Sequence, residues 1–202
     1  MKDTREYIVK VALKLFLLKS FKEVTMQEIV QETKLSKGAF YHYFKSKEEV
    51  FLEVVEAFYL SDEINGEKLN DYTSLKDFYC AYIVHLQKFI EYIKEVVEID
   101  IDNATYNVNY FVMVFDAVRR FPDFKQKMME SQQKDIETWK NIVEIAKKNN
   151  EISTKMPSEY VARIFLQTVD ATFMNAITGN KFADALKDIQ ALWDSFFEEL
   201  KS

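Results

Sequence analysis

The chain has 202 residues, of which 48% are hydrophobic and 30% are charged, so we expect a globular rather than a disordered protein. Its three glycines and two prolines are too few for the frequent turns of an all-β fold, which favours an all-α fold of about nine helices. The net charge is −6, and the single cysteine, Cys80, excludes an internal disulfide and a cysteine-based metal cluster.

Four helices are predicted in the first 60 residues. Thr25 and Glu28 have the spacing of a capping box, and Ser36 and Ser46 are each placed to cap the helix that follows them. Apolar residues repeat at helical spacing in the longer segments. The four helices are predicted over about 3–19, 26–33, 36–43 and 47–59.

Longer helices are predicted beyond a polar segment, residues 61–74, which is the best candidate for a boundary. Pro122 and Pro157 suit the starts of helices, and Gly179 suits the end of one. Five further helices are predicted over about 75–97, 104–121, 123–148, 158–178 and 182–200.

Charge is distributed unevenly along the chain. Residues 1–50 hold ten Lys or Arg against seven Asp or Glu, a balance of +3, whereas the remaining 152 residues carry −9. A basic end on an acidic body indicates that this end has an anionic partner.

Residues 25–47 have the arrangement of a helix-turn-helix, in which two short helices are joined by a tight connection. A recognition helix enters the major groove of DNA by its N-terminal residues. Here these are Lys37, which can reach a base edge or a phosphate, and the small Gly38 and Ala39, which allow a close approach of the backbone.

This segment resembles the DNA-binding signature of the TetR family of bacterial transcriptional regulators over about residues 5–55. The residues that carry the resemblance are Thr25, Ile29, Val30, Thr33, Leu35, Ser36, Gly38, Phe40, Tyr41, Tyr43, Phe44, Ser46, Lys47, Glu48 and Val50. His42 and Tyr43 depart from the residues that are common in the family at their positions, although both can still donate a hydrogen bond to phosphate. The DNA contacts that the resemblance implies are Thr25, Gln27, Ser36, Lys37, Gly38, Ala39, Tyr41, His42, Tyr43 and Lys47.

The aromatic run from Phe40 to Phe44 divides by helical geometry. Phe40 and Phe44 are four residues apart and share one face, which we expect to pack into the core. Tyr41 lies about 100° away and can face the duplex together with Lys37.

The resemblance further implies a helix-turn-helix domain over residues 1–47 and a helical ligand-binding and dimerisation domain over residues 48–202, with residues 47–60 as the connecting helix. The last two predicted helices are apolar on two faces, which favours a four-helix interface in a homodimer over a thicker monomer core. The candidate interface residues are Phe165, Phe173, Leu186, Ile189, Trp193 and Phe196.

The segment between these ends is rich in aromatic residues with few polar ones, as small-molecule sites are. Most of the rings are expected to be core. The candidate pocket residues are Tyr82, His85, Phe89, Tyr110, Phe111, Phe115, Trp139 and Gln167.

The sequence therefore predicts a dimeric regulator, most simply a repressor, that binds an operator in double-stranded DNA and is released by a small-molecule effector. The alternatives are an activator of the same family and a small-molecule-binding helical protein that does not act by operator release. No catalytic acid–base pair, metal-ligand spacing or phosphate-binding loop is evident, so we expect neither an enzyme nor a cofactor. Without a signal peptide or a membrane span, we expect a cytoplasmic protein.

Overall fold

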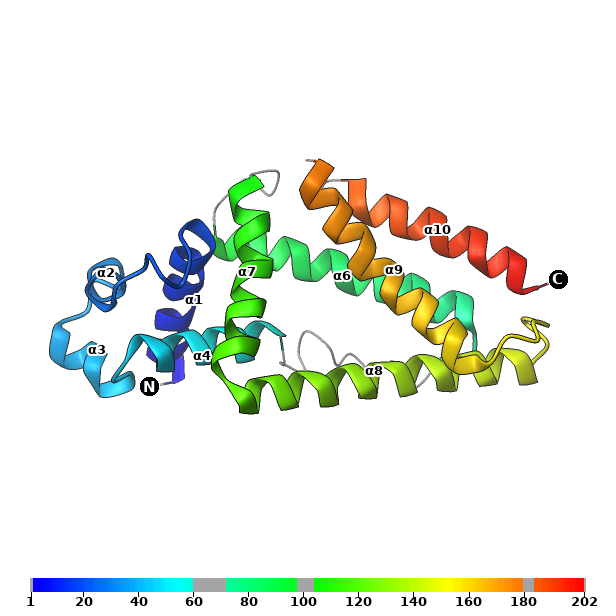
Figure 1. Ribbon diagram of the computed structural model, residues 1–202, viewed down its shortest axis with the longest axis horizontal. Coiled ribbons are helices and arrows are strands. Elements are labelled where there is room, and N and C mark those ends of the chain that lie inside the picture. Colours follow the sequence, from blue (N-terminus) through cyan, green and yellow to red (C-terminus); the bar gives the residue numbers. More distant parts are fainter. Residues whose placement is uncertain (1, 60–71, 98–103, 180–183, 202) are drawn as a thin grey trace. The chain divides into compact units, whose positions relative to one another are not determined.

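The computed structural model describes residues 2–59, 72–97, 104–179 and 184–201, and within these ranges the regular elements are all helices (Figure 1). This confirms the all-α prediction. The N-terminal helices are α1 (Lys2–Leu18), α2 (Met26–Glu32), α3 (Lys37–Tyr43) and α4 (Lys47–Tyr59). The longer helices are α6 (Leu75–Val97), α7 (Ala104–Arg120), α8 (Pro122–Lys148), α9 (Ser158–Gly179) and α10 (Ala185–Leu200).

The observed helix bounds differ from the predicted ones by at most a few residues. Pro122 is the first residue of α8, because the first helical position needs no N–H donor. The last helix begins at Ala185 rather than at 182. The predicted breaks at 61–74 and 98–103 lie outside the described residues, apart from residues 72–74.

The chain packs into two compact units, one formed by Met1–Asn65 with Tyr92–Met128 and the other by Gly66–Glu91 with Met129–Ser202. These bounds fall within α6 and within α8. The two units reflect how the chain packs, whereas the predicted division at residue 47 separates two functional parts. That division stays a prediction.

The core of the first unit is built from α1, α4 and α7. Phenylalanines from separate segments meet there: the ring centroids of Phe16 and Phe51 are 5.0 Å apart, and those of Phe21 and Phe51 are 4.5 Å apart. Such pairs are worth about 0.5–1.5 kcal/mol beyond the area that they bury. The rings therefore join α1 to α4 just behind the two short helices.

Two hydrogen bonds connect α7 to its neighbours in the first unit. Asn109 donates from its amide nitrogen to the carbonyl of Leu17 at 2.9 Å, near the end of α1. The hydroxyl of Tyr59, the last residue of α4, donates to the carbonyl of Tyr110 at 2.9 Å. As a result, α7 is tied to α1 and α4, the two helices that pack behind the short helices α2 and α3.

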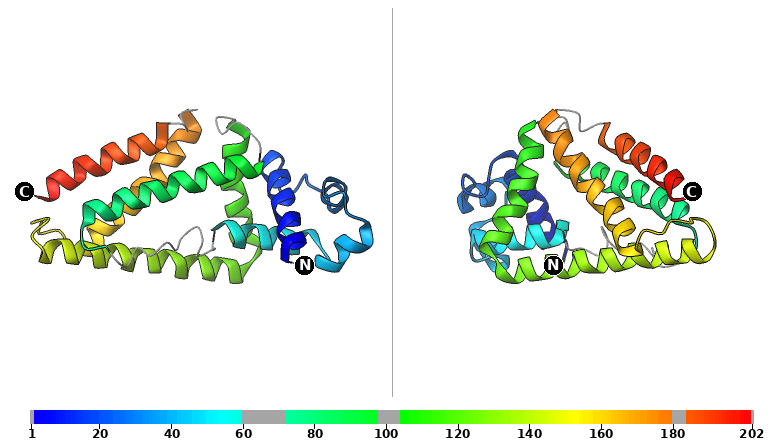
Figure 2. Two further views of the ribbon diagram at one scale, coloured as in Figure 1. Left: turned by 180° about the vertical axis from the view of Figure 1, so that it is seen from behind. Right: turned by 45° about the vertical axis from the view of Figure 1, so that its right-hand side comes forward.

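The second unit has an aromatic core that takes residues from four helices. Tyr79 of α6, Trp139 of α8, Phe165 of α9 and Trp193 of α10 are all buried. The rings of Trp139 and Phe165 stack at 5.0 Å, and the indole N–H of Trp193 donates to the carbonyl of Phe165 at 3.2 Å. In this unit α9 and α10 pack on each other and run in opposite directions (Figures 1 and 2).

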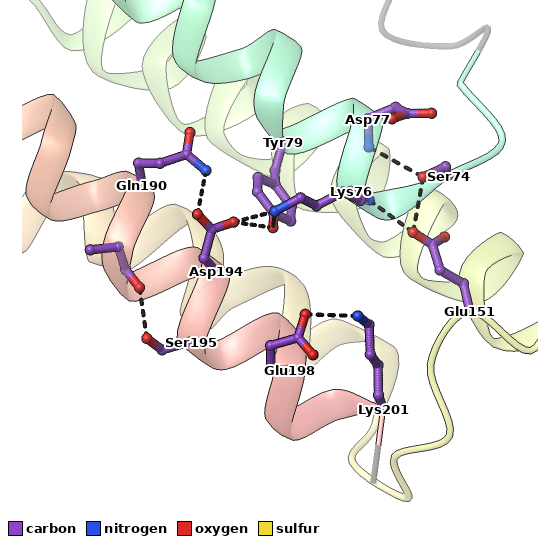
Figure 3. A network of polar contacts seen from close by, with 11 residues as sticks. Ser74, Lys76, Asp77, Tyr79, Glu151, Gln190, Asp194, Ser195, Glu198 and Lys201 are labelled. Atoms are coloured by element: carbon purple, nitrogen blue, oxygen red, sulfur yellow. Dashed lines mark hydrogen bonds and ion pairs between the residues drawn. The ribbon is translucent and has the colours of Figure 1, made fainter.

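A polar network fastens α6 to α10 (Figure 3). Asp194 accepts hydrogen bonds from the ammonium of Lys76, from the hydroxyl of Tyr79 at 2.6 Å and from the amide of Gln190 at 2.9 Å. Burial alone would raise the pKa of Asp194, but these three donors lower it to about 2. Burial and the hydrogen bond to Asp194 raise the pKa of Tyr79.

The start of α6 is capped from the segment that follows α8 (Figure 3). The carboxylate of Glu151 accepts from the backbone N–H groups of Leu75 at 2.8 Å and of Lys76 at 3.0 Å, and from the hydroxyl of Ser74 at 2.9 Å. These N–H groups have no partner within their own helix, so Glu151 supplies the acceptor that they lack.

Candidate DNA-binding surface

The second helix starts with the predicted capping box. The hydroxyl oxygen of Thr25 accepts from the N–H of Glu28 at 3.2 Å, and the Glu28 carboxylate accepts in return from the N–H of Thr25 at 3.4 Å. Such a cap is worth roughly 1 kcal/mol. Because the Thr25 oxygen is the acceptor, its O–H proton remains available to donate outward.

The third helix is short and is also capped as predicted. The hydroxyl oxygen of Ser36 accepts from the N–H of Ala39 at 3.2 Å. The turn between α2 and α3 passes through Lys34 at φ 54°, a left-handed backbone that non-glycine residues adopt at a cost of about 1–2 kcal/mol. This turn lets α3 begin only a few residues after α2 ends.

Phe40 and Phe44 are both completely buried, which confirms that these rings belong to the core. The side chain of Arg5, on α1, contacts the end of α3. It donates a hydrogen bond to the Tyr43 carbonyl at 3.2 Å, and its guanidinium lies 4.4 Å from the Phe44 ring centroid. The same guanidinium binds both carboxylate oxygens of Glu53 at 2.8 and 2.9 Å, which lowers the pKa of Glu53.

The predicted DNA contacts lie mostly on the solvent-facing side of the two short helices. Tyr41 has 39% of its surface exposed, whereas Tyr43 and Lys47 are half-buried. The other predicted contacts are exposed: Thr25, Gln27, Ser36, Lys37, Gly38, Ala39 and His42. One side of α3 is therefore anchored in the core, and the other offers hydroxyls, an ammonium and bare backbone to solvent.

Gly38 has open space on its side-chain side, since a Cβ built on this residue meets no atom within 4 Å. The fold itself therefore does not require glycine here. Helix propensity would favour alanine by up to about 1 kcal/mol. A glycine at the second position of a recognition helix is what a close approach to DNA would call for.

Lys47 has a structural role that the sequence did not indicate. Its ammonium donates to the carbonyls of Phe21 at 2.7 Å and of Val24 at 2.6 Å, and lies 4.3 Å from the Phe21 ring centroid. These bonds tie the start of α4 to the loop between α1 and α2. One of its three N–H groups remains for a phosphate. No local signal shows this role, because the partners lie 23 to 26 residues earlier in the chain.

The candidate pocket residues fall into both units. Tyr82, His85 and Phe89 are half-buried on α6, Trp139 is buried, and Gln167 is exposed on α9, all in the second unit. In the first unit, Tyr110 and Phe111 are half-buried on α7, and Phe115 has 62% of its surface exposed.

Three of the six candidate interface residues need correction. Phe165, Ile189 and Trp193 are buried within the second unit itself, so they have no side-chain surface to offer a second copy. Phe173, Leu186 and Phe196 are half-buried against the same core. Apolar periodicity identifies an inward face, but it cannot tell the protein's own core from an interface.

Acidic residues that the sequence analysis passed over lie beside the aromatic core of the second unit. They are Asp135 on α8 and Asp170 on α9. The available signal was a single charged residue in an otherwise uncharged stretch, as in FLQTVDATF. In the described part of the chain, no group of three or more His, Cys, Asp or Glu could hold a metal ion, and no helix is long and apolar enough to cross a membrane.

A capped helix, a tight turn and a short second helix with an outward polar face define a helix-turn-helix DNA-binding domain. Residues 8–54 match the family model for bacterial regulatory proteins, tetR family. The N-terminal segment is thus similar to the DNA-binding segment of these regulators.

Two relatives of known sequence are HTH-type transcriptional regulators. The chain is 46% identical over 59 residues to the HTH-type transcriptional regulator YuxN of Bacillus subtilis (strain 168), a match to 29% of this chain and 20% of that protein. The chain thus spans about a fifth of the length of YuxN. Its identity to the HTH-type transcriptional regulator YfiR of the same organism is 24% over 195 residues, covering 96% of this chain and 89% of that protein.

The HTH-type transcriptional repressor NemR of Escherichia coli (strain K12) is similar in both sequence and fold. It is 35% identical over 57 residues, covering 28% of this chain and 29% of NemR. The crystal structure of reduced E. coli NemR aligns with a TM-score of 0.65 at 18% identity, over 98% of this chain and 96% of that one. At this identity the structural likeness concerns the fold.

Proposed function

We propose that this chain is a transcriptional repressor that acts in the cytoplasm, binds a palindromic operator as a dimer through α3, and is released by a small-molecule effector. The observation that carries the proposal is the division of α3. Its apolar rings are buried, while Ser36, Lys37 and Gly38 stand exposed at the end that enters a major groove. NemR, which shares the fold, is named a repressor.

A second copy would have to cover apolar surface that a single chain leaves exposed. The outward face of α9 has such a stripe, with Tyr160, Ile164 and Met174 exposed at helical spacing, and 52% of the surface of Leu192 is exposed on α10. Because α9 and α10 pack side by side, the pair from each copy can form a four-helix interface. We therefore propose this outer face in place of the buried residues as the dimer contact.

Release by an effector requires that the effector favour one spacing of the two recognition helices over another. Within the first unit, α7 bonds to both α1 and α4, and α4 is tied by Lys47 to the loop that precedes α2. A shift of α4 or α7 would therefore move α2 and α3 as one body. In this mechanism, the operator-bound spacing is about one helical turn, roughly 34–36 Å.

A mobility-shift assay with the DNA upstream of the protein's own gene tests operator binding. The wild type should bind this DNA in preference to an unrelated fragment of equal length, and Lys37→Ala should weaken binding. Equal binding of both fragments would contradict a specific operator on this DNA.

Light scattering tests the dimer. Wild-type protein at micromolar concentration should have the mass of two chains, and the double variant Ile164→Glu, Leu192→Glu should shift it toward one chain while circular dichroism still shows a helical fold. Val84→Glu, at an equally exposed valine on α6, is the control and should stay dimeric. A monomeric wild type would rule out the proposed interface.

A further inference from the structure

Beside the aromatic core of the second unit lies a group of polar side chains that we call the Tyr82 site: Tyr82 on α6, Asp135 and Trp139 on α8, and Asp170 on α9. The ring centroids of Tyr82 and Trp139 are 5.3 Å apart at 69°. Asp135 precedes Trp139 by four residues and so lies on the same face of α8. Burial raises the pKa of the Tyr82 phenol, and the charges of Asp135 and Asp170 raise it further.

Polar atoms of this site have no hydrogen-bond partner among the residues that the structure describes. The indole N–H of Trp139 is buried without a hydrogen bond to any described residue, although the side chain is only 1% exposed. Among the described residues, none forms a hydrogen bond or an ion pair with the carboxylates of Asp135 and Asp170. A buried polar group without a partner costs roughly 1–3 kcal/mol, so the Trp139 N–H, together with two carboxylates that no described cation pairs, indicates a site that is completed from outside.

Burial also affects the pKa values of the two carboxylates. Burial raises the pKa of Asp135 to about 6 and raises that of Asp170 as well. Asp170 is exposed by its accessible area, so it stands at the rim of the site, whereas Asp135 is half-buried. Among the described residues, Lys134 is the charged neighbour that lowers the pKa of Asp135, and its effect is smaller than that of burial.

We propose that the Tyr82 site binds an organic cation, held between the carboxylates of Asp135 and Asp170 and the rings of Tyr82 and Trp139, with the Trp139 N–H available to an acceptor atom on the same molecule. A cation within about 6 Å of an aromatic ring face is attracted by it, and a desolvated carboxylate adds full opposite charge. This inference names the chemical class of the effector and so rests on the proposed function.

The test compares cations with neutral molecules of matched shape. Choline is paired with 3,3-dimethylbutan-1-ol, and tetraphenylphosphonium with triphenylphosphine oxide. Both tryptophans of the chain, Trp139 and Trp193, lie in this core, so their fluorescence reports binding to the full-length protein. We expect at least one cation to bind roughly tenfold or more tightly than its neutral partner.

Charge-removing variants separate the site from other parts of the protein. Asp135→Asn and Asp170→Asn should each lower the affinity for the cation by roughly fivefold or more and leave that for the neutral molecule unchanged. Asp188→Asn, at an exposed acid on α10, should change neither. Without ligand, Asp135→Asn should melt at the same temperature as the wild type or higher, which shows that lost binding does not come from lost folding.

Equal binding of both members of each pair, or no binding of either cation up to about 10 mM, would overturn the proposal. So would a cation affinity that neither substitution alters. The DNA assay is read separately. If a cation binds but does not release the DNA, the Tyr82 site binds cations but is not the effector site. If the protein does not bind DNA at all, the proposed function is refuted, and the result on cation binding is unaffected.

Discussion

Gly38 and Lys37 begin the recognition helix with bare backbone and an exposed ammonium, and neither contributes a contact that the fold needs. We predict that Gly38→Ala raises the unfolding free energy by up to about 1 kcal/mol, because alanine is the better helix former and its Cβ meets open space. The same methyl would stand between the backbone and DNA, so operator affinity should fall roughly tenfold. Thermal melts and fluorescence anisotropy measure the two effects. An unchanged affinity would show that DNA does not approach this residue.

Lys37 and Lys47 should respond differently to substitution. Lys37→Ala should flatten the dependence of log K on log salt by roughly 0.9, as expected for one lost phosphate contact, with little change in stability. Lys47→Met should lose about 1–3 kcal/mol of stability, because the carbonyls of Phe21 and Val24 lose their donor, and it should flatten the slope as well if the free N–H binds phosphate. Lys155→Ala, at an exposed lysine of the second unit, is the control. A Lys47 variant with wild-type stability would contradict the anchoring role.

Asp135 should make the ligand-free protein less stable as pH rises. The folded pKa is about 6 against an ordinary value near 4, so the folded state holds a proton that the unfolded state has lost between these values. The unfolding free energy should therefore fall from pH 4 to 6 and then level off. Asp135→Asn carries no such charge and should be more stable at pH 7, by on the order of 1–3 kcal/mol. Urea titrations at several pH values test this, and a variant less stable than wild type at pH 7 would contradict it.

At the scale of elements, α6 and α10 are held by Asp194, whose pKa is about 2 in the folded protein. For an acid whose pKa is lowered by folding, the stabilisation is complete above the ordinary value near 4 and is lost as pH falls through 2. Asp194→Asn should therefore remove the part of the acid dependence that lies between pH 4 and 2. The stabilisation that the Lys76–Asp194 ion pair gives the wild type is modest, because 42% of each side chain is exposed. Identical acid unfolding curves for variant and wild type would rule this role out.

Helix bounds and caps are the features that the sequence predicted best. Thr25, Ser36 and Ser46 cap the helices that they were expected to cap, because capping depends on residues three positions apart. The burial of Phe40 and Phe44 followed from helical periodicity in the same way.

Contacts over long sequence distances were not predictable. The ammonium of Lys47 binds carbonyls more than twenty residues away, and Glu151 caps a helix that starts 76 residues earlier. Periodicity also assigned Phe165 and Trp193 to a dimer surface, although the protein's own core covers them. The candidate site was thus predictable where it is built from one continuous segment, and not where distant helices build it.

At the scale of the whole molecule, the residues proposed to contact DNA belong to the small N-terminal part of a chain whose remaining residues are strongly acidic. Since an acidic body should repel DNA, the proposed binding depends on the few contacts expected from α2 and α3. In the proposed dimer, each copy offers one recognition helix, so we expect both to be needed for a high affinity. The proposed operator specificity and the salt dependence of binding therefore both depend on this short surface.

The most direct test is selection of DNA by the purified protein from a random pool, followed by sequencing. We predict enrichment of an inverted repeat whose half-sites are centred about 10–10.5 base pairs apart, and loss of that enrichment with Lys37→Ala. Recovery of unrelated sequences by the wild type, or an unchanged repeat selected by the variant, would contradict the claim that α3 reads an operator.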